Sequence, residues 1–194
     1  MQSKQTSYDV IVIGSGVAGL SAAVSAQENG ASVCVIERAP ADDAGGNTRH
    51  TGAYIRMKSV DEVSDDFEEH FADNAGGYLD PLMMADVARD QQSWPPLLKA
   101  FSFVDPNVVS ALAQQAPATL KWLTGYGVRF TPLEVPFPTS AQPRIVPSGG
   151  GQAIVESLTK VFTNKGGTIL YETAATSLIQ NPEGAVCGVR ALGR

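Results

Sequence analysis

The sequence predicts an α/β fold in which parallel strands alternate with helices. Two observations carry this prediction: a strand, glycine-rich turn, helix and second strand over residues 9–37, and a helix followed by short strands over residues 152–192. Apolar strands separated by helices are typical of a parallel sheet. The chain has 194 residues, 43% of them hydrophobic, which suits one domain with a buried core.

The first strand is expected at residues 9–13, and it runs directly into Gly14-Ser15-Gly16-Val17-Ala18-Gly19. Gly14 permits a tight turn, Gly16 lets the backbone approach a phosphate, and Gly19 lets the following helix pack closely on the strand. That helix is expected over residues 17–29, with Gly30 as its stop. A second strand over residues 32–36 ends in Glu37.

The order of these features matters more than the glycines alone. A strand before the GxGxxG motif, a helix after it and an acid 23 residues beyond Gly14 (37 − 14 = 23) together form a Rossmann-like dinucleotide-binding fingerprint. The N–H groups of the helix N-terminus favour phosphates, and Glu37 can accept hydrogen bonds from ribose hydroxyls. An acid there repels a 2′-phosphate, which disfavours NADP. The alternative is a structural glycine turn in an ordinary βαβ unit.

Residues 38–60 are predicted to form an extended loop, with Gly45, Gly46 and Gly52 along it. The middle third of the chain is predicted to be helical, with helices at 61–74 and 80–93, another from Asp105-Pro106, and a short one at 117–126.

Residues 131–151 hold five prolines and then three glycines, which predicts a stiff, irregular connection. A helix is expected over 152–164, then strands at 168–171, 174–179 and 185–192. Residues 181–184 form the turn between the last two strands.

The formal net charge of −6 argues against nucleic acid or an anionic membrane as a partner. Residues 1–7 are short and polar, and are expected to form a flexible tail without a signal-peptide core. No apolar run is long enough to span a bilayer, so the cytoplasm is the default location.

Few residues suggest other chemistry. Cys34 and Cys187 are read as small buried hydrophobic residues, and two histidines cannot form a multi-histidine metal site, so no metal is expected. Arg49 and His50 are interpreted either as lining the substrate side of a cofactor or as solvated loop residues.

With the glycines, Glu37 and Gly45-Gly46-Asn47-Thr48 noted, the chain resembles the FAD-binding domain of the fumarate reductase and succinate dehydrogenase flavoprotein family. That family includes L-aspartate oxidases, 3-ketosteroid dehydrogenases and tricarballylate dehydrogenases. The resemblance is strong over residues 8–52 and 144–189, and loose between 53 and 140. It implies a glutathione-reductase-like domain over residues 8–194, with a parallel sheet, a helical insertion at 53–143 and a small β-hairpin.

The resemblance implies FAD as the cofactor and assigns residues to it. Gly14–Gly19 face the pyrophosphate, Glu37 and Arg38 lie at the adenosine ribose, and Gly45–Thr48 run along the pyrophosphate and the flavin. Thr51 and Gly52 lie near the isoalloxazine ring, and Ala174 or Ala175 offers backbone groups to adenine. Family members with covalent FAD have a histidine where this chain has Asn47, so the resemblance implies non-covalent FAD.

The resemblance also implies an incomplete protein. In the family, a capping domain that carries substrate-binding and proton-donating residues, and a further cofactor-contacting stretch, follow the hairpin at which this chain ends. The sequence therefore looks like the N-terminal, truncated portion of such a flavoprotein, and its catalytic residues are unknown.

Three functions remain open on the sequence. The leading one is an FAD-dependent oxidoreductase, or its N-terminal portion, which transfers hydride between flavin N5 and a small, carboxylated substrate. The second is a non-catalytic FAD- or adenine-nucleotide-binding fragment, or half of a split flavoprotein that needs a partner chain. The third is an NAD-binding Rossmann domain, against which the Gly45–Thr48 segment argues.

Overall fold

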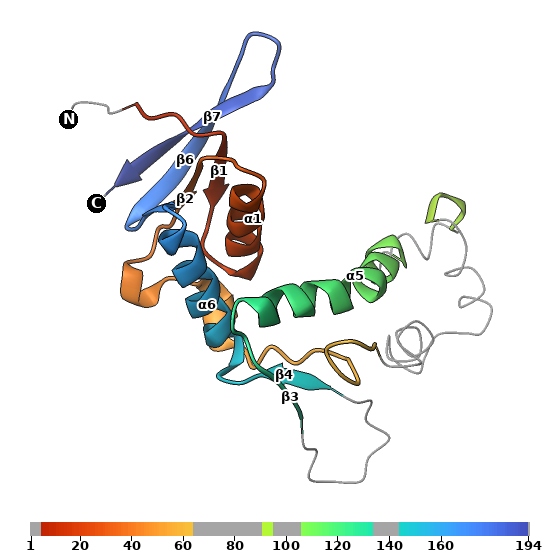
Figure 1. Cartoon of the computed structure of the whole chain (residues 1–194). Coiled ribbons are helices and arrows are strands. Elements are labelled where there is room, and N and C mark those ends of the chain that lie inside the picture. The colour runs from red at the N-terminus through yellow and green to blue at the C-terminus, as the bar shows by residue number, and fades with distance from the viewer. Residues whose placement is uncertain (1–4, 64–90, 95–105, 134–143, 194) are drawn as a thin grey trace. The chain divides into compact units, whose positions relative to one another are not determined.

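The computed structural model describes residues 5–63, 91–94, 106–133 and 144–193 (Figure 1). Most residues of the helices predicted at 61–74 and 80–93 lie outside this part of the chain. The chain divides into two compact units. The first comprises Met1–Ala53, Tyr126–Arg129 and Val146–Arg194, and the second comprises Tyr54–Gly125 and Phe130–Ile145.

The first unit contains the predicted parallel sheet. Its strands are β1 (Val10–Ile13), β2 (Val33–Ile36) and β5 (Thr168–Leu170), in the order β1-β2-β5. Both pairings are parallel, and Ile36 of β2 is in register with Ile13 on one side and Leu170 on the other. The three strands therefore end at one edge of the sheet, and the predicted α/β class is confirmed.

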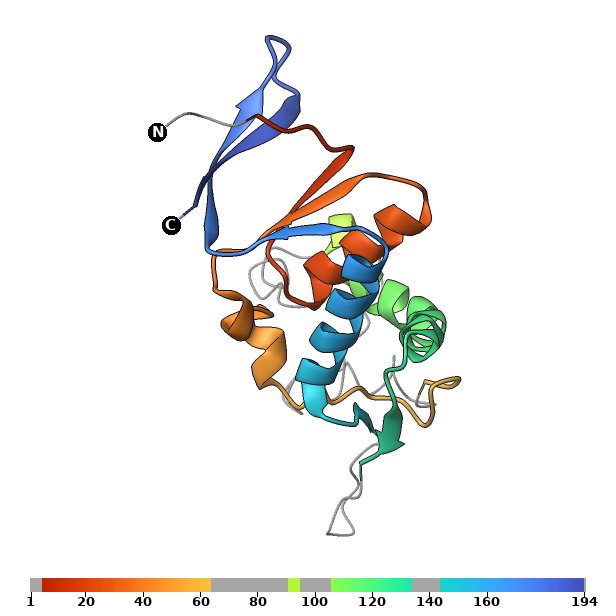
Figure 2. The same ribbon diagram turned by 60° about the vertical axis from the view of Figure 1, so that its left-hand side comes forward.

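Helices α1 (Val17–Glu28) and α6 (Gly150–Asn164) lie together on one side of this sheet (Figures 1 and 2). The apolar side chains between helices and sheet are fully or nearly fully buried, as expected for a core sealed from water. They include Val33 and Val35 of β2, Leu20, Ala23 and Val24 of α1, and Ile154, Leu158 and Phe162 of α6.

Glycines with positive φ set the end of α1 and the start of α6. Helix α1 ends at Glu28, and Gly30 then adopts the left-handed conformation with φ +83°, so the predicted stop is confirmed. Helix α6 begins at Gly150, two residues before the predicted start, because Gly149 at φ +93° turns the chain directly into the helix.

Strands β6 (Thr173–Gln180) and β7 (Val186–Gly193) form the predicted hairpin, on the side of the sheet opposite the helices (Figures 1 and 2). The Asn181 carbonyl and side chain accept hydrogen bonds from Gly184 and Ala185 in its turn. The expectation that Cys187 is buried is wrong. Cys187 lies at an irregularity of the register, in a ribbon that is open on much of its surface, and its side chain is exposed. Cys34, in β2, is buried as predicted.

In the second unit, helix α5 runs from Pro106 to Gly125 and replaces the two separate helices predicted there. Pro117 lies inside it. A proline removes one backbone N–H, but residues 111–120 are mostly alanine, leucine and glutamine, which favour a helix enough to continue through it. Within the described residues, no helix is both long and apolar enough to cross a membrane.

Short strands and bridges occupy other segments that were predicted to be irregular or helical. Strand β3 (Phe130–Pro132) pairs with β4 (Ile145–Pro147), and the Leu133 N–H donates to the Arg144 carbonyl. The helix predicted to start at Asp61 does not start there, because Val63 pairs with Met57 across a tight turn. Gln91–Ser93 form the 3-10 helix η3.

Candidate dinucleotide site

The carboxyl edge of the parallel sheet gathers most of the predicted site residues. Gly14 donates its N–H to the Ile36 carbonyl at 2.8 Å, and Glu37 donates its own to the Leu170 carbonyl at 2.9 Å. The Thr173 N–H in turn donates to the Glu37 carbonyl at 2.9 Å. These bonds place the glycine turn, the acid and the start of β6, with Ala174 and Ala175, side by side. Ligands of open parallel sheets bind at such edges.

The three glycines of the motif differ in whether the protein's own structure requires a glycine at that position. Gly14 has φ +94°, which other residues rarely adopt. A Cβ on Gly19 would lie 2.0 Å from the Gly14 carbonyl oxygen, so the helix packs too closely for any side chain. Gly16 has φ −69°, and its added Cβ would meet only ordinary contacts, the nearest being Thr48 Oγ1 at 3.5 Å. The fold itself therefore requires Gly14 and Gly19, whereas the described residues give no reason for a glycine at position 16.

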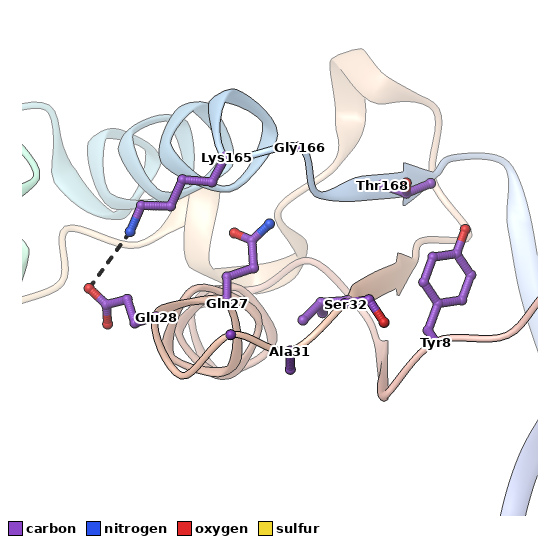
Figure 3. Close-up of a pocket in the computed structure, with 10 residues that line it drawn as sticks. Tyr8, Gln27, Glu28, Ala31, Ser32, Lys165, Gly166 and Thr168 are labelled. Atoms are coloured by element: carbon purple, nitrogen blue, oxygen red, sulfur yellow. Dashed lines mark ion pairs between the residues drawn. The ribbon is translucent and has the colours of Figure 1, made fainter.

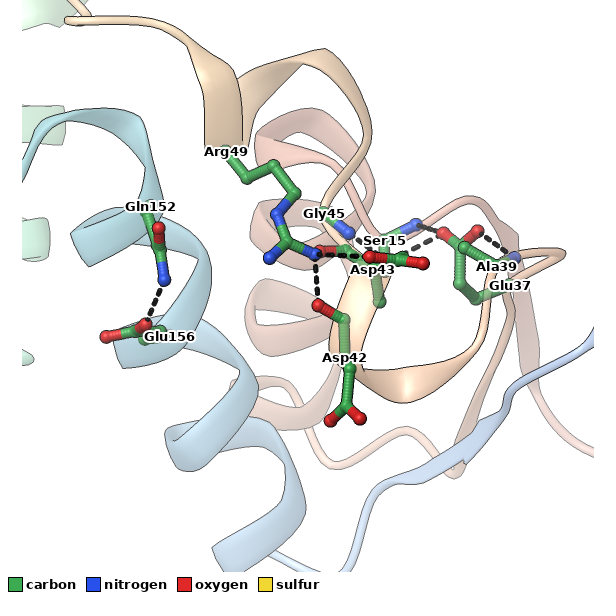
Figure 4. Close-up of polar contacts among 10 residues, drawn as sticks. Ser15, Glu37, Ala39, Asp42, Asp43, Gly45, Arg49, Gln152 and Glu156 are labelled. Atoms are coloured by element: carbon green, nitrogen blue, oxygen red, sulfur yellow. Dashed lines mark hydrogen bonds and ion pairs between the residues drawn. The ribbon is translucent and has the colours of Figure 1, made fainter.

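Glu37 lies at the centre of a buried hydrogen-bond network (Figure 4). Glu37 is 7% exposed as a residue, and Ser15 is 2% exposed. Glu37 Oε2 accepts from the Ser15 N–H at 2.8 Å and from the Ser15 hydroxyl at 2.6 Å. Glu37 Oε1 accepts from the Ala39 N–H at 2.8 Å. The sequence motif predicted an acid at this place but gave no signal that Ser15 would bind it.

This network affects the ionisation of Glu37. Burial raises the pKa of the carboxyl group, but the hydrogen bonds from Ser15, Ala39 and Arg38 outweigh it and leave the pKa below the ordinary value of 4.5. Glu37 is therefore a carboxylate at neutral pH. Burial and the charge of Glu37 together raise the pKa of Tyr171 above its usual value. Tyr171 follows β5 at the same edge and was not among the predicted site residues.

The loop after β2 is tied to the glycine turn by two further bonds. It contains the 3-10 helices η1 (Ala41–Asp43) and η2 (Gly46–His50). The Gly45 N–H donates to the Ser15 hydroxyl at 3.1 Å, and the Val17 N–H donates to Thr48 Oγ1 at 3.1 Å. Thr48 thus caps the first turn of α1, and a hydroxyl that accepts one bond keeps its own proton to donate.

The same loop packs against the start of α6. A Cβ on Gly151 would lie 2.0 Å from the Thr48 carbonyl oxygen, and one on Gly150 would lie 2.9 Å from the Thr51 carbonyl oxygen. The Gly151 N–H donates to that Thr51 carbonyl at 2.8 Å. Residues 48–52 are therefore held between two helix N-termini, which the sequence alone did not indicate.

Arg49 has a structural role in this loop (Figure 4). Its guanidinium group donates to the carbonyl of Asp42 and to that of Ala44 at 3.2 Å, and it lies 4.0 Å from the Asp43 carboxylate. These bonds join η1 to η2, and its side chain is 21% exposed. Among the other predicted site residues, six are exposed at the surface of this edge: Ala18, Arg38, Gly46, Asn47, Thr51 and Ala174.

A separate cavity of about 680 Å³ lies at the amino end of the strands (Figure 3). Tyr8, Gln27, Ser32 and Thr168 line it, together with Lys165, whose ammonium group lies 3.9 Å from the Glu28 carboxylate. None of the predicted site residues lines this cavity. Among the described residues, no group of three or more His, Cys, Asp or Glu side chains could hold a metal ion.

Residues 9–193 match the family described as the FAD binding domain. The chain belongs to this family. The fumarate reductase and 3-ketosteroid dehydrogenase resemblance of the sequence is thereby confirmed, and the family points to FAD as the cofactor. The edge fits that cofactor, because position 16 leaves room beside the backbone and no acidic side chain in the first turn of α1 opposes a pyrophosphate.

The relatives are flavoprotein oxidoreductases that are longer than this chain. An NADH:fumarate oxidoreductase of Klebsiella pneumoniae is 28% identical over 193 residues, which cover 95% of this chain and 18% of that protein. A 3-oxosteroid 1-dehydrogenase of Mycolicibacterium smegmatis is 31% identical over 141 residues, which cover 71% of this chain and 23% of that protein.

A flavocytochrome c3 fumarate reductase in its open conformation shares the fold. Its structure superposes with a TM-score of 0.66 at 20% identity and covers 96% of this chain and 30% of that one. The chain thus spans less than a third of each of these three proteins, and it corresponds to the FAD-binding domain of FAD-dependent oxidoreductases.

Proposed function

We propose that this chain binds FAD without a covalent bond and serves as the cofactor-binding part of an oxidoreductase. The observation that carries the proposal is Gly16, which the described contacts do not require and which borders the open N-terminus of α1. A backbone without a side chain at this point lets a pyrophosphate approach the helix N–H groups. A structural turn alone would require only Gly14 and Gly19.

Each predicted residue has a place in this proposal. The segment from Gly14 to Gly19 contacts the pyrophosphate, with Thr48 donating its hydroxyl proton to a phosphate oxygen. Glu37 accepts from the adenosine ribose, beside Arg38, and the backbone of Ala174 or Ala175 meets the adenine edge. The segment that leads to the flavin comprises Gly45, Gly46, Asn47, Thr51 and Gly52.

The mode of attachment follows from Asn47. An amide side chain cannot form the bond to the flavin that a histidine forms at this position in covalent members of the family. FAD released into the supernatant by acid precipitation of the purified chain would support non-covalent binding. Flavin that stays with the precipitated protein would contradict it.

The bound flavin supplies hydride chemistry at N5, and this chain orients it. We propose a small, carboxylated substrate for the complete protein, in line with the fumarate named for one relative. The 3-oxosteroid named for another relative is the competing substrate class. A partner chain or further segment would supply the catalytic residues, and the cytoplasmic location expected from the sequence stays a prediction.

The second candidate is a module that binds FAD or adenine nucleotides without catalysis. It is favoured because every site residue assigned above has a role toward the cofactor and none has a role toward a substrate. The purified chain, loaded with FAD and reduced by dithionite, distinguishes the two. Reoxidation by fumarate would support catalysis in this chain, and reduced flavin that persists with both fumarate and a 3-oxo-Δ1,4-steroid would support the module.

Titration tests cofactor binding itself. The chain is expected to quench the fluorescence of added FAD and to leave NAD unbound at the same concentrations. A Gly16→Ala chain that keeps its circular dichroism spectrum but no longer binds FAD would locate the site at the glycine turn. Preferential binding of NAD would overturn the proposal.

A further inference from the structure

We propose that Arg49 is a positioning residue that holds the loop of residues 41–50 in the shape that receives the flavin side of FAD. This inference rests on the proposed function, in which the exposed part of that loop leads to the flavin. The sequence left Arg49 with two interpretations, either at the substrate side of the cofactor or in solvent. The contacts of its guanidinium group support a third role, inside the loop itself.

The guanidinium group of Arg49 binds the backbone of the segment that precedes it. Its Nη1 atom donates to the Asp42 carbonyl and to the Ala44 carbonyl, the latter at 3.2 Å. Nη1 of a guanidinium group carries two protons, so these bonds use both of them. Figure 4 shows the group directed at the Asp42 carbonyl. Because the Arg49 side chain is only 21% exposed, it is held against the loop and closes the chain into a ring.

This ring encloses two consecutive glycines in left-handed conformations. Gly45 has φ +113°, and Gly46 has φ +55°. Glycine loses more backbone freedom on ordering than any other residue, so this part of the loop is the costliest to hold in one shape. The bond from Arg49 to the Ala44 carbonyl spans both glycines. Hydrogen bonds from a charged donor are stronger than those between neutral groups, and this one therefore opposes the freedom of the glycine pair.

The loop is also bound on its inner side, where the Gly45 N–H donates to the Ser15 hydroxyl at 3.1 Å. Gly46 and Asn47 lie between Gly45 and Arg49 in the sequence, and both are exposed. They are the residues proposed to lead to the flavin. All of these bonds join groups of the protein, so none of them requires a bound cofactor. The loop is therefore preorganised, which increases affinity because less order has to be imposed on binding.

The nearby carboxylate of Asp43 contributes less than the two carbonyls. It lies 4.0 Å from Arg49 Nη1, and the Asp43 side chain is 78% exposed. Ion pairs between solvent-exposed groups contribute little to stability. The positioning role is therefore assigned to the two carbonyl bonds, and substitution of Asp43 should leave it intact.

Arg49→Met tests the role by removing the donors while keeping an unbranched side chain. Binding of FAD is compared by calorimetry with binding of ADP, which carries the adenosine and pyrophosphate of FAD without the flavin. The dissociation constant for FAD is expected to rise about tenfold, because the loop must then be ordered on binding, and that for ADP by less than about threefold. A general loss of stability would weaken both ligands equally, so an unchanged ratio of the two constants would overturn the inference.

Three further variants sharpen this test. Arg190→Met is the matched control for charge, since Arg190 is exposed in β7, and both constants should stay within about twofold of the unaltered chain. Asp43→Asn should also stay within about twofold. Arg49→Lys keeps a charged nitrogen that can donate to two carbonyls, and its FAD constant should rise by less than about threefold.

These variants keep the inference testable even if Arg49→Met does not fold. A tenfold loss of FAD affinity in folded Arg49→Lys would contradict the assigned role of the charged donor. The same loss in Asp43→Asn would show that the ion pair, and not the carbonyl bonds, holds the loop.

The midpoint potential of the bound flavin distinguishes a role within the loop from a place beside the flavin ring. A positive charge close to the ring raises this potential, so its removal would lower it. If Arg49 acts within the loop, Arg49→Met and Arg190→Met should both have the potential of the unaltered chain in a spectroelectrochemical titration. A lower potential in Arg49→Met alone would place the guanidinium group at the flavin and overturn the inference.

The two proposals fail in different ways. Absence of FAD binding by the unaltered chain would remove the proposed function. Normal FAD binding by the unaltered chain, with an unchanged ratio of FAD to ADP constants in Arg49→Met, would remove only the role assigned to Arg49.

Discussion

Two glycine-rich turns lead into the two helices beside the parallel sheet, and they differ in what requires their glycines. At the start of α6, Gly150 and Gly151 have no room for a side chain, since an added Cβ would lie 2.9 Å from the Thr51 carbonyl oxygen and 2.0 Å from the Thr48 carbonyl oxygen, respectively. At the start of α1, Gly16 has room for one. The α6 turn is closed by the protein's own backbone, whereas the α1 turn leaves space beside Gly16, where we propose that the pyrophosphate binds.

Gly19 lies in the turn that leads into α1, but like Gly150 and Gly151 it has no room for a side chain. Of the substitutions considered, Gly19→Ala should therefore have the largest effect on the free energy of unfolding. In Gly19→Ala the new Cβ would lie 2.0 Å from the Gly14 carbonyl oxygen. We expect a loss of at least about 3 kcal/mol in the free energy of unfolding, because backbone must move to relieve the contact. Urea denaturation followed by circular dichroism measures it. A loss below 1 kcal/mol would contradict the close packing of α1.

Gly16→Ala should separate binding from stability. Its Cβ meets ordinary contacts only, so the free energy of unfolding should change by less than about 1 kcal/mol. FAD affinity should fall at least a hundredfold, because the methyl group occupies the space that a pyrophosphate needs. Urea denaturation and FAD fluorescence titration on the same preparation measure both. If the variant binds FAD normally, the space beside Gly16 is not needed for the cofactor, and the proposed difference between the two turns is wrong.

Thr48→Val tests the hydrogen bond between Thr48 and the first turn of α1, and its expected effect is smaller than those of the glycine substitutions. The substitution removes the acceptor for the Val17 N–H, and loss of such a cap costs about 1 kcal/mol. The lost hydroxyl donor should also weaken FAD about tenfold. Thr163→Val is the control, because the Thr163 hydroxyl bonds only to carbonyls of its own helix. Equal effects of the two variants on FAD affinity would argue against Thr48 at the phosphate.

The smallest expected effect is the contribution of Glu37 to the pH dependence of folding stability. Its folded pKa lies below 4.5, so the stabilisation is fully present above about pH 4.5 and is lost as pH falls through the folded pKa. Glu37→Gln should therefore flatten the acid decline of the melting temperature between pH 5 and pH 3. Glu183→Gln, in the exposed hairpin turn, is the control. An identical acid decline in Glu37→Gln and the unaltered chain would show that Glu37 does not contribute.

The features that the sequence predicted are local ones. Gly14, Gly19 and Gly30 need either an unusual φ or close contact within a few residues of chain, and so the motif and the helix stop could be recognised from spacing. The place of Glu37 at the carboxyl edge follows from the strand that it ends. The parallel sheet was predictable for the same reason, since each strand has its own apolar segment.

The features that the sequence did not predict depend on residues that are distant along the chain. The bond between Ser15 and Glu37 and the contact of Gly151 with Thr48 arise only when separate segments meet. Burial of Cys187 was wrongly inferred from its apolar neighbours, because a two-stranded ribbon leaves many side chains exposed. Pro117 was read as the start of a helix, whereas the surrounding residues carry the helix through it.

The contact between Gly151 and Thr48 also bears on the order of folding. The two residues are 103 positions apart (151 − 48 = 103), yet the Thr48 carbonyl and the α6 backbone touch. Contacts between distant residues close large loops and therefore form slowly. Residues 48–52 cannot reach their final conformation until residues 150–151 have joined the rest of the unit. During refolding, the ability to quench FAD fluorescence should thus appear after most helical signal has returned.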